Sequence, residues 1–257
     1  MANAPQRLVW ATRPAHQNAA WQTQLSALGP EVIALPLLDI VPLAGDDETL
    51  RIKQHVLKLD EYQHVLFVSQ NAVAEAFRWF EDYWPQLPVG IHYYGVGAKT
   101  AKAIAAFGVP VLEAGAAMNS EALLALPELK DVQDSKILIC RGQGGRPKLG
   151  EELAARGAKV DYLELYQRAT PQGASEALAN IDWQQRHVIP LFSGETLQNL
   201  LSILPQTVAR TNVQLVVPAE HVAEQARHAG FAAEVAQNAS EQAMLAATAK
   251  VLNEDTP

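Results

Sequence analysis

The stretch of this 257-residue chain most suggestive of chemistry is a glycine-rich loop bounded by two arginines, Arg141-Gly142-Gln143-Gly144-Gly145-Arg146. It follows an apolar run typical of a strand and precedes a segment with helical spacing. Glycines let the backbone approach a ligand, a helix N-terminus offers N–H groups to an anion, and arginines add forked donors. The spacing matches neither a dinucleotide fingerprint nor a Walker A loop. The loop predicts an anion site, with a purely structural turn as the alternative.

Three further positions combine the end of a predicted strand with the start of a helix: Ser69, Ser193 and Gly97. A serine there caps the helix, which stabilises it by about 1 kcal/mol. The same helix start can also hold an anion. Capping alone is the simpler interpretation for either serine taken singly, and the glycine pair Gly95 and Gly97 is weak evidence by itself.

Tyr166 is the remaining candidate for chemistry, because it lies just past the predicted strand 160–165 and close to Arg168. A tyrosine at a strand end usually packs, and becomes a catalytic candidate where a cleft opens beside it. The sequence has no GxSxG, HExxH or CxxC pattern, and its seven histidines show no metal-ligand spacing. We therefore expect neither a metal nor a cofactor, and little functional-group chemistry.

Three segments recur in the same order along the chain, with offsets of 128, 124 and 122 residues between matching positions. Such a long period indicates domain duplication rather than a repeat array. It predicts two similar domains with a cleft between them. The matching positions are Gly29 with Gly157, Ser69 with Ser193, and Gly108 with Gly230.

The elements around these positions alternate between continuous apolar strands and helices. This alternation predicts an α/β fold with parallel sheets covered on both faces, including a strand at 109–113. Ligands of such folds sit beyond the carboxyl ends of the strands, where the loops described above lie. The proline-punctuated segments 37–45 and 168–171 are candidate crossings between the domains.

The composition excludes several classes of protein. Hydrophobic residues make up 49% and charged residues 19%, which suits packed cores. The net charge of −8 lacks the basic footprint of a nucleic-acid binder. No apolar run is long enough to span a membrane and no signal peptide is apparent, so a cytoplasmic location is expected. The single cysteine, Cys140, can form no intramolecular disulfide and reads as a small buried hydrophobe.

In this order, the motifs resemble those of the uroporphyrinogen-III synthase family over about residues 8–252. Each motif is short, and their order and spacing carry the resemblance. The matching segments are Thr12-Arg13-Pro14, Leu35-Pro36, 67–73 (FVSQNAV), Gly95-Val96-Gly97 with Thr100-Ala101, Arg141-Gly142 with Gly144-Gly145-Arg146, Tyr166-Gln167-Arg168, and Phe192-Ser193-Gly194.

The resemblance implies two flavodoxin-like domains joined by a two-stranded linker. One would combine residues 1–37 with 172–257, and the other would be the inserted segment 38–171. It also implies a cofactor-free lyase of tetrapyrrole (haem) biosynthesis. Its substrate would be hydroxymethylbilane, closed with loss of water and inversion of the last ring to uroporphyrinogen III. A monomer is expected, because two lobes can already enclose the substrate. The enzyme would mainly impose geometry, because the substrate also closes unaided to the wrong isomer.

The resemblance places the catalytic role on Tyr166, which would assist the leaving hydroxyl. Counting from Gly230 puts Val222 where the family often has a hydroxyl residue, so Val222 is left out of the site. The expected substrate-binding residues are Arg13, Ser69, Asn71, Gly97, Thr100, Arg141, Gly142, Arg146, Ser193 and Gly194.

Two other functions compete with the synthase. A non-catalytic cleft-binding or regulatory module of the same two-lobed plan is the main alternative. A nucleotide-dependent transferase is disfavoured, because the chain carries no phosphate-binding fingerprint.

Overall fold

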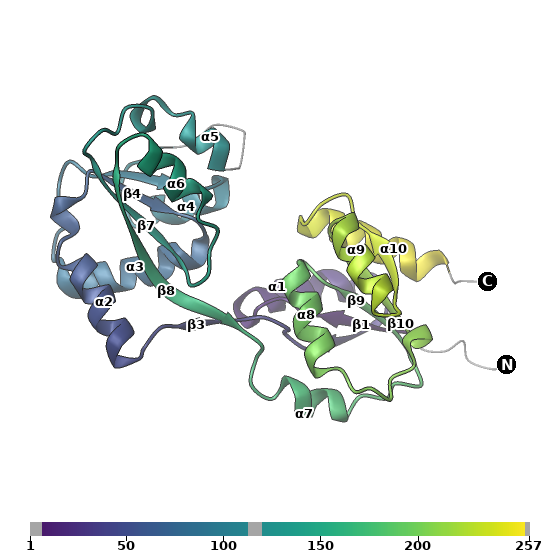
Figure 1. Ribbon diagram of the computed structural model, residues 1–257. Coiled ribbons are helices and arrows are strands. Elements are labelled where there is room, and N and C mark those ends of the chain that lie inside the picture. The colour runs from purple at the N-terminus through teal and green to yellow at the C-terminus, as the bar shows by residue number, and fades with distance from the viewer. Residues whose placement is uncertain (1–6, 113–119, 255–257) are drawn as a thin grey trace. The chain divides into compact units, whose positions relative to one another are not determined.

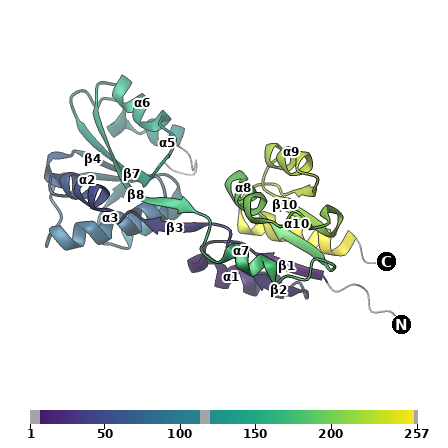
Figure 2. The ribbon, with the colours of Figure 1, turned by 60° about the horizontal axis from the view of Figure 1, so that its bottom comes forward.

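The computed structural model describes residues 7–112 and 120–254. The chain divides into two compact units, one formed by Met1–Asp39 with Ala169–Pro257 and the other by Ile40–Arg168. Each unit has its own sheet with helices on both faces (Figures 1 and 2). The chain passes from one unit to the other within two strands, β3 (Asp39–Pro42) and β8 (Lys159–Ala169), which are neighbours in one sheet. These strands correspond to the expected two-stranded linker.

The first unit contains a five-stranded sheet in the order β11-β10-β9-β1-β2. Its neighbouring strands all run parallel, and β1 pairs with both β2 and β9. The N-terminal βαβ segment is therefore completed by strands from the other end of the chain. Its elements are β1 (Arg7–Ala11), α1 (Ala15–Ser26), β2 (Glu31–Ala34), α7 (Ala174–Ala179), β9 (Arg186–Pro190), α8 (Gly194–Ile203), a 3-10 turn (Arg210–Asn212), β10 (Val213–Val217), α9 (Glu220–His228), β11 (Ala232–Val235) and α10 (Glu241–Glu254).

Two apolar clusters fill the first unit, one on each face of its sheet. Helices α7, α8 and α9 cover one face with side chains such as Leu178 and Leu200. Helices α1 and α10 cover the other with Trp21, Leu25 and Met244. Burial on both faces explains why these strands are continuous apolar runs.

The second unit contains a six-stranded sheet in the order β3-β8-β7-β4-β5-β6. The pairs from β8 to β6 run parallel, so the carboxyl ends of β8, β7, β4 and β5 lie at one edge. The elements are β3, α2 (Asp46–Val56), a 3-10 turn (Leu59–Glu61), β4 (His64–Phe67), α3 (Gln70–Tyr83), β5 (His92–Gly95), α4 (Ala98–Ala105), β6 (Val111–Leu112), α5 (Ser120–Leu124), a 3-10 turn (Pro127–Leu129), β7 (Lys136–Gly142), α6 (Lys148–Ala155) and β8.

The sheet of the second unit also separates two apolar clusters. Helices α2, α3 and α4 pack on the face that carries Phe67 and Cys140. Helices α5 and α6 pack on the face that carries Leu66 and Ile139. These two faces position different residues of the candidate site.

The expected α/β class with parallel sheets is confirmed, and two element boundaries differ from expectation. Strand β6 begins only at Val111, because Pro110 has no N–H to give to a sheet, and Glu113 lies outside the described residues. Strand β8 continues to Ala169, so Tyr166 lies within the strand rather than past its end. The neighbouring strand β3 explains the extra length.

Candidate active site

Two hydroxyl groups form a hydrogen bond at the carboxyl edge of the sheet in the second unit. Ser69 Oγ lies 2.9 Å from Tyr166 Oη, although the two residues come from different strands. Ser69 also caps α3, because its Oγ accepts a hydrogen bond from the Ala72 N–H at 3.0 Å. Capping holds the serine hydroxyl in place, so the serine fixes the position of the phenol.

The backbone of β7 and β8 explains how the tyrosine reaches the serine. Cys140 lies opposite Leu163 and Arg141 opposite Glu164, but Gly142 lies opposite Tyr166, so β8 carries one extra residue. A bulge of this kind re-aims the side chain that follows it. The fully buried Tyr166 therefore joins the same apolar cluster as Leu165 instead of alternating to the opposite face.

Gly142 is the residue that admits the tyrosine ring. A Cβ at this position would lie 2.5 Å from Tyr166 Cε2 and 2.7 Å from Cζ, closer than any side chain tolerates. The Gln143 N–H then donates to the Tyr166 carbonyl oxygen at 2.7 Å. Glycine is required here for close packing, a role that the sequence alone did not distinguish from ligand binding.

Arg141 lies on the other face of the sheet and is already engaged. Its Nε and Nη2 donate to Glu164 Oε1 at 3.2 and 2.9 Å, and its guanidinium stacks on the Tyr162 ring at 4.3 Å. Its Nη1 also lies 3.5 Å from the Arg146 carbonyl oxygen. The structure therefore does not bring Arg141 together with Tyr166. The Arg146 side chain is exposed on the loop.

The other predicted residues of the second unit lie at helix starts beside the hydroxyl pair. Asn71 is half-buried in the first turn of α3. Gly97 is the N-cap of α4 with a φ of 93°, a conformation that favours glycine. The buried Thr100 follows in the first turn, where its N–H donates to the Gly97 carbonyl oxygen at 3.0 Å. Helix α3 starts at the hydroxyl pair itself, because Ser69 is its N-cap, and α4 starts after the neighbouring strand β5.

In the first unit, Ser193 occupies the position that matches Ser69. Its Oγ accepts from the Thr196 N–H at 3.2 Å, and Thr196 Oγ1 accepts from the Ser193 N–H at 3.1 Å, a complete capping box. Gly194 is the first residue of α8, and an added Cβ would make only ordinary contacts at 3.8 Å. Capping accounts for Ser193, whose side-chain hydrogen bonds within the described residues are those with Thr196.

Arg13 follows β1 at the same edge and is also engaged. Its guanidinium donates to Glu241 and Gln17 and stacks on the Phe192 ring at 4.6 Å. Burial lowers the pKa of Arg13, an effect that the nearby Glu241 opposes. The carboxylates Glu164 and Glu241 are the residues that sequence reasoning missed, since no spacing marks either as an arginine partner.

Residues 7–112 and 120–254 contain no group of three or more His, Cys, Asp or Glu side chains placed to hold a metal ion. No helix within these ranges is both long and apolar enough to cross a bilayer.

Comparison with known sequences points to one family. The family model described as uroporphyrinogen-III synthase HemD matches residues 19–246. The chain is 37% identical to a uroporphyrinogen-III synthase of Salmonella typhimurium, over 92% of this chain and 97% of that protein. It is 34% identical to a uroporphyrinogen-III synthase of Escherichia coli, over 93% and 98%. These full-length matches favour the synthase over the non-catalytic module.

Solved structures show the same fold at low identity. The uroporphyrinogen-III synthetase of Helicobacter pylori aligns with a TM-score of 0.61 at 16% identity, covering 96% of this chain and 99% of that one. A mutant uroporphyrinogen III synthase of Thermus thermophilus aligns with a TM-score of 0.59 at 17% identity, covering 97% and 99%. With the sequence matches, these findings place the chain in the uroporphyrinogen-III synthase family.

Proposed function

We propose that the chain is a cyclising hydro-lyase that converts hydroxymethylbilane into uroporphyrinogen III. The terminal hydroxyl of this linear tetrapyrrole leaves as water, the last pyrrole ring is inverted, and the macrocycle closes. The observation that carries the proposal is the Ser69 and Tyr166 hydroxyl pair at a carboxyl edge. Membership of the synthase family supports it independently.

The substrate's own electrons drive the loss of its hydroxyl, so the protein's main task is orientation. Holding the reacting carbons in place can lower a barrier by several kcal/mol, because the ordering is completed on binding. The substrate carries eight carboxylate arms. We assign arms to the N-termini of α3, α4 and α8, because the partial positive charge at a helix N-terminus attracts anions. Asn71, Thr100 and Gly194 lie in the first turns of these helices.

The arginines have a different role in this proposal. Arg141 and Arg13 are each bound to a carboxylate, so an incoming arm must share or replace Glu164 or Glu241. Arg146 is exposed and can meet an arm without breaking an ion pair. We therefore assign the direct charge contact to Arg146 and electrostatic support to the other two arginines.

Proton transfer to the leaving hydroxyl is assigned to Tyr166 acting with Ser69. Tyr166 is fully buried, whereas Ser69 is half-buried at the mouth of the site. The serine hydroxyl accepts from the phenol on one side and can donate to the substrate on the other. A phenol is a weak acid, so we expect assistance rather than an absolute requirement.

The remaining assignments concern the protein's setting. We propose that the enzyme works in the cytoplasm as a monomer, and that nucleic acid is not a partner. The net charge of −8 supports the last point, because nucleic-acid binding requires a positively charged surface. Sedimentation of the purified chain at micromolar concentration tests the monomer, and a dimer mass would contradict it.

A coupled isomer assay tests the proposed reaction. Hydroxymethylbilane is generated in situ, the purified chain is added, and the oxidised porphyrin isomers are separated. We expect type III to replace type I in proportion to the amount of protein. Type I alone, from a chain shown to be folded by circular dichroism, would remove the synthase and leave a binding module.

A further inference from the structure

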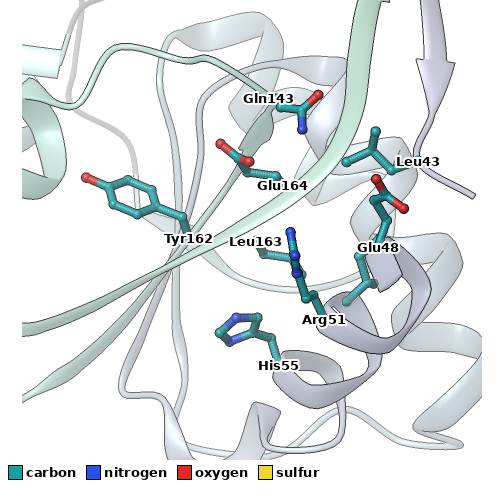
Figure 3. Close-up of a pocket in the computed structure, with 9 residues that line it drawn as sticks. Leu43, Glu48, Arg51, His55, Gln143, Tyr162, Leu163 and Glu164 are labelled. Carbon is teal, nitrogen blue, oxygen red and sulfur yellow. The ribbon is translucent and has the colours of Figure 1, made fainter. Parts of the chain in front are cut away.

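A pocket of about 310 Å³ lies within the second unit, apart from the hydroxyl pair. It forms where α2 packs beside β8, and Figure 3 shows its side chains. The volume falls in the range of sites for small molecules. The lining residues are Leu43, Glu48, Arg51, Ile52, His55, Gln143, Tyr162, Leu163 and Glu164.

Arg51 is the cationic side chain of this pocket that has no protein partner among the described residues. It extends from α2 toward the middle of the pocket, below Gln143 and Glu164 (Figure 3). It forms no hydrogen bond or ion pair with any residue that the structure describes. A guanidinium has five N–H donors in a planar fork, which matches a carboxylate.

The two acidic residues of the lining do not neutralise Arg51. Glu164 accepts two hydrogen bonds from Arg141, at 3.2 and 2.9 Å, on the side facing α6. Glu48 folds back over the start of its own helix, with Oε2 only 2.1 Å from where a Cβ of Gly45 would stand. A carboxylate in the first turn of a helix is stabilised there by the helix dipole. Arg51 is therefore the lining group whose N–H donors are open to a ligand, with the Glu48 carboxylate at the helix start beside it.

His55 supplies a second polar group, with an orientation set by its neighbours. Tyr62 donates its hydroxyl proton to Asp161 Oδ2 at 2.9 Å, so its oxygen is left to accept from His55 Nδ1 at 3.0 Å. The Tyr62 pKa is raised by burial and then by Asp161, so the phenol keeps its proton. This chain of bonds leaves His55 Nε2 as the nitrogen available to a ligand.

The rest of the lining is apolar or neutral. Leu43, Ile52 and Leu163 are buried side chains that form the floor. Gln143 adds an amide opposite Arg51. We propose that this pocket binds a carboxylate carried on a small apolar body, with Arg51 and Gln143 holding the carboxylate and the three aliphatic side chains holding the body.

Gln143 connects the pocket to the candidate active site. Its side chain lines the pocket, while its N–H donates to the carbonyl oxygen of Tyr166 at 2.7 Å. The carboxylate can therefore come from two sources. It is either one arm of the tetrapyrrole substrate, reaching across the loop, or a separate small acid whose binding is felt at Tyr166.

A binding titration tests the pocket without any turnover, so its result does not depend on the proposed function. The ¹⁵N-labelled full chain is titrated with 3-phenylpropionate, a carboxylate on an aromatic body. We expect saturable shifts at the amides of Gln143 and His55. Arg51→Gln should weaken binding by about tenfold, the lower end for a hydrogen bond between charged groups.

Arg78→Gln is the matched control, since it removes the same charge from an exposed helical site paired with Glu75. Both substitutions are on exposed positions, and the spectra themselves report folding. Equal affinities for the Arg51 and Arg78 variants would overturn the proposal. Absence of saturation at about 20 mM, beyond the millimolar range expected for so small a ligand, would also overturn it.

The isomer assay then distinguishes the two sources. If the pocket holds a substrate arm, Arg51→Gln raises KM with little change in kcat, and 3-phenylpropionate competes with substrate. If it holds a separate acid, KM is unchanged in the variant and 3-phenylpropionate alters kcat in the wild-type chain alone. Binding with neither kinetic effect would limit the proposal to the binding site and overturn the link through Gln143.

Discussion

Replacing Ser69 by alanine tests whether the serine positions the tyrosine. The change removes the cap of α3 and the 2.9 Å bond to Tyr166. The cap contributes about 1 kcal/mol, and a hydrogen bond in a partly buried site contributes about 1 kcal/mol. We therefore expect a loss of about 2 kcal/mol in the free energy of unfolding. Tyr166→Phe should lose about 1 kcal/mol, because it removes only the second bond.

The chain contains its own control for the cap. Ser193→Ala removes the same type of cap from α8, where no tyrosine is bound, and should cost about 1 kcal/mol. Urea unfolding followed by tryptophan fluorescence measures each variant. The double variant Ser69→Ala with Tyr166→Phe should show a coupling of about 1 kcal/mol. A coupling near zero would refute the inference that the serine and the phenol depend on each other.

The same variants show whether Ser69 passes a proton from Tyr166 to the substrate or only holds the phenol in place. If the proton passes through Ser69, the serine and tyrosine variants should lower kcat by similar factors, and the double variant should be no slower. Residues that act as a unit show this lack of additivity. We expect a decrease of at most about 100-fold, the lower range for general-acid assistance. Multiplying effects in the double variant would contradict the relay.

Three further predictions concern packing, acid and thiol chemistry. Gly142→Ala should displace the Tyr166 ring, lowering kcat and the unfolding midpoint in urea together, whereas Gly194→Ala should leave the unfolding midpoint nearly unchanged. Burial lowers the pKa of His64 and His187 below 6.5, so the unfolded chain binds more protons at acid pH. The free energy of unfolding is therefore highest above pH 6.5 and decreases as the pH falls, by at most about 1.4 kcal/mol per pH unit for each histidine. His187→Gln should make the free energy of unfolding less dependent on pH, and an unchanged slope would contradict this prediction. Burial raises the pKa of the Cys140 thiol, so a thiol reagent should react with it only after urea unfolding. Rapid reaction of the folded chain would contradict the burial of Cys140 in its apolar cluster.

The class of the fold follows from the sequence for a simple physical reason. A sheet covered on both faces requires strands that are apolar on both sides, and such runs separated by helices are visible throughout. The parallel pairings confirm this prediction. The lengths of two strands were predicted less well. Strand β6 starts only after Pro110, and β8 is lengthened by its neighbour β3.

The contacts within the site could not be predicted from the sequence. Ser69 and Tyr166 are 97 residues apart, and they meet only because β7 lies between their strands and β8 bulges beside Gly142. Simple alternation along β8 would put Tyr166 on the same face as Glu164. Arg13 binds Glu241, 228 residues further along the chain, and no spacing indicates that pair. Residue types at strand ends were predictable, whereas their partners required the order of the strands.

Because of the bulge in β8, the sheet of the second unit separates two groups of polar side chains. On one face lie the phenol and serine hydroxyls, and on the other lie Arg141 and Glu164. Substitutions in α6 can therefore change how Arg141 and Glu164 are held without touching the hydroxyl pair. Substitutions in α3, on the other face, act on the hydroxyl pair and leave the Arg141 and Glu164 ion pair in place. A scaffold divided in this way allows ligand preference and reactivity to diverge separately.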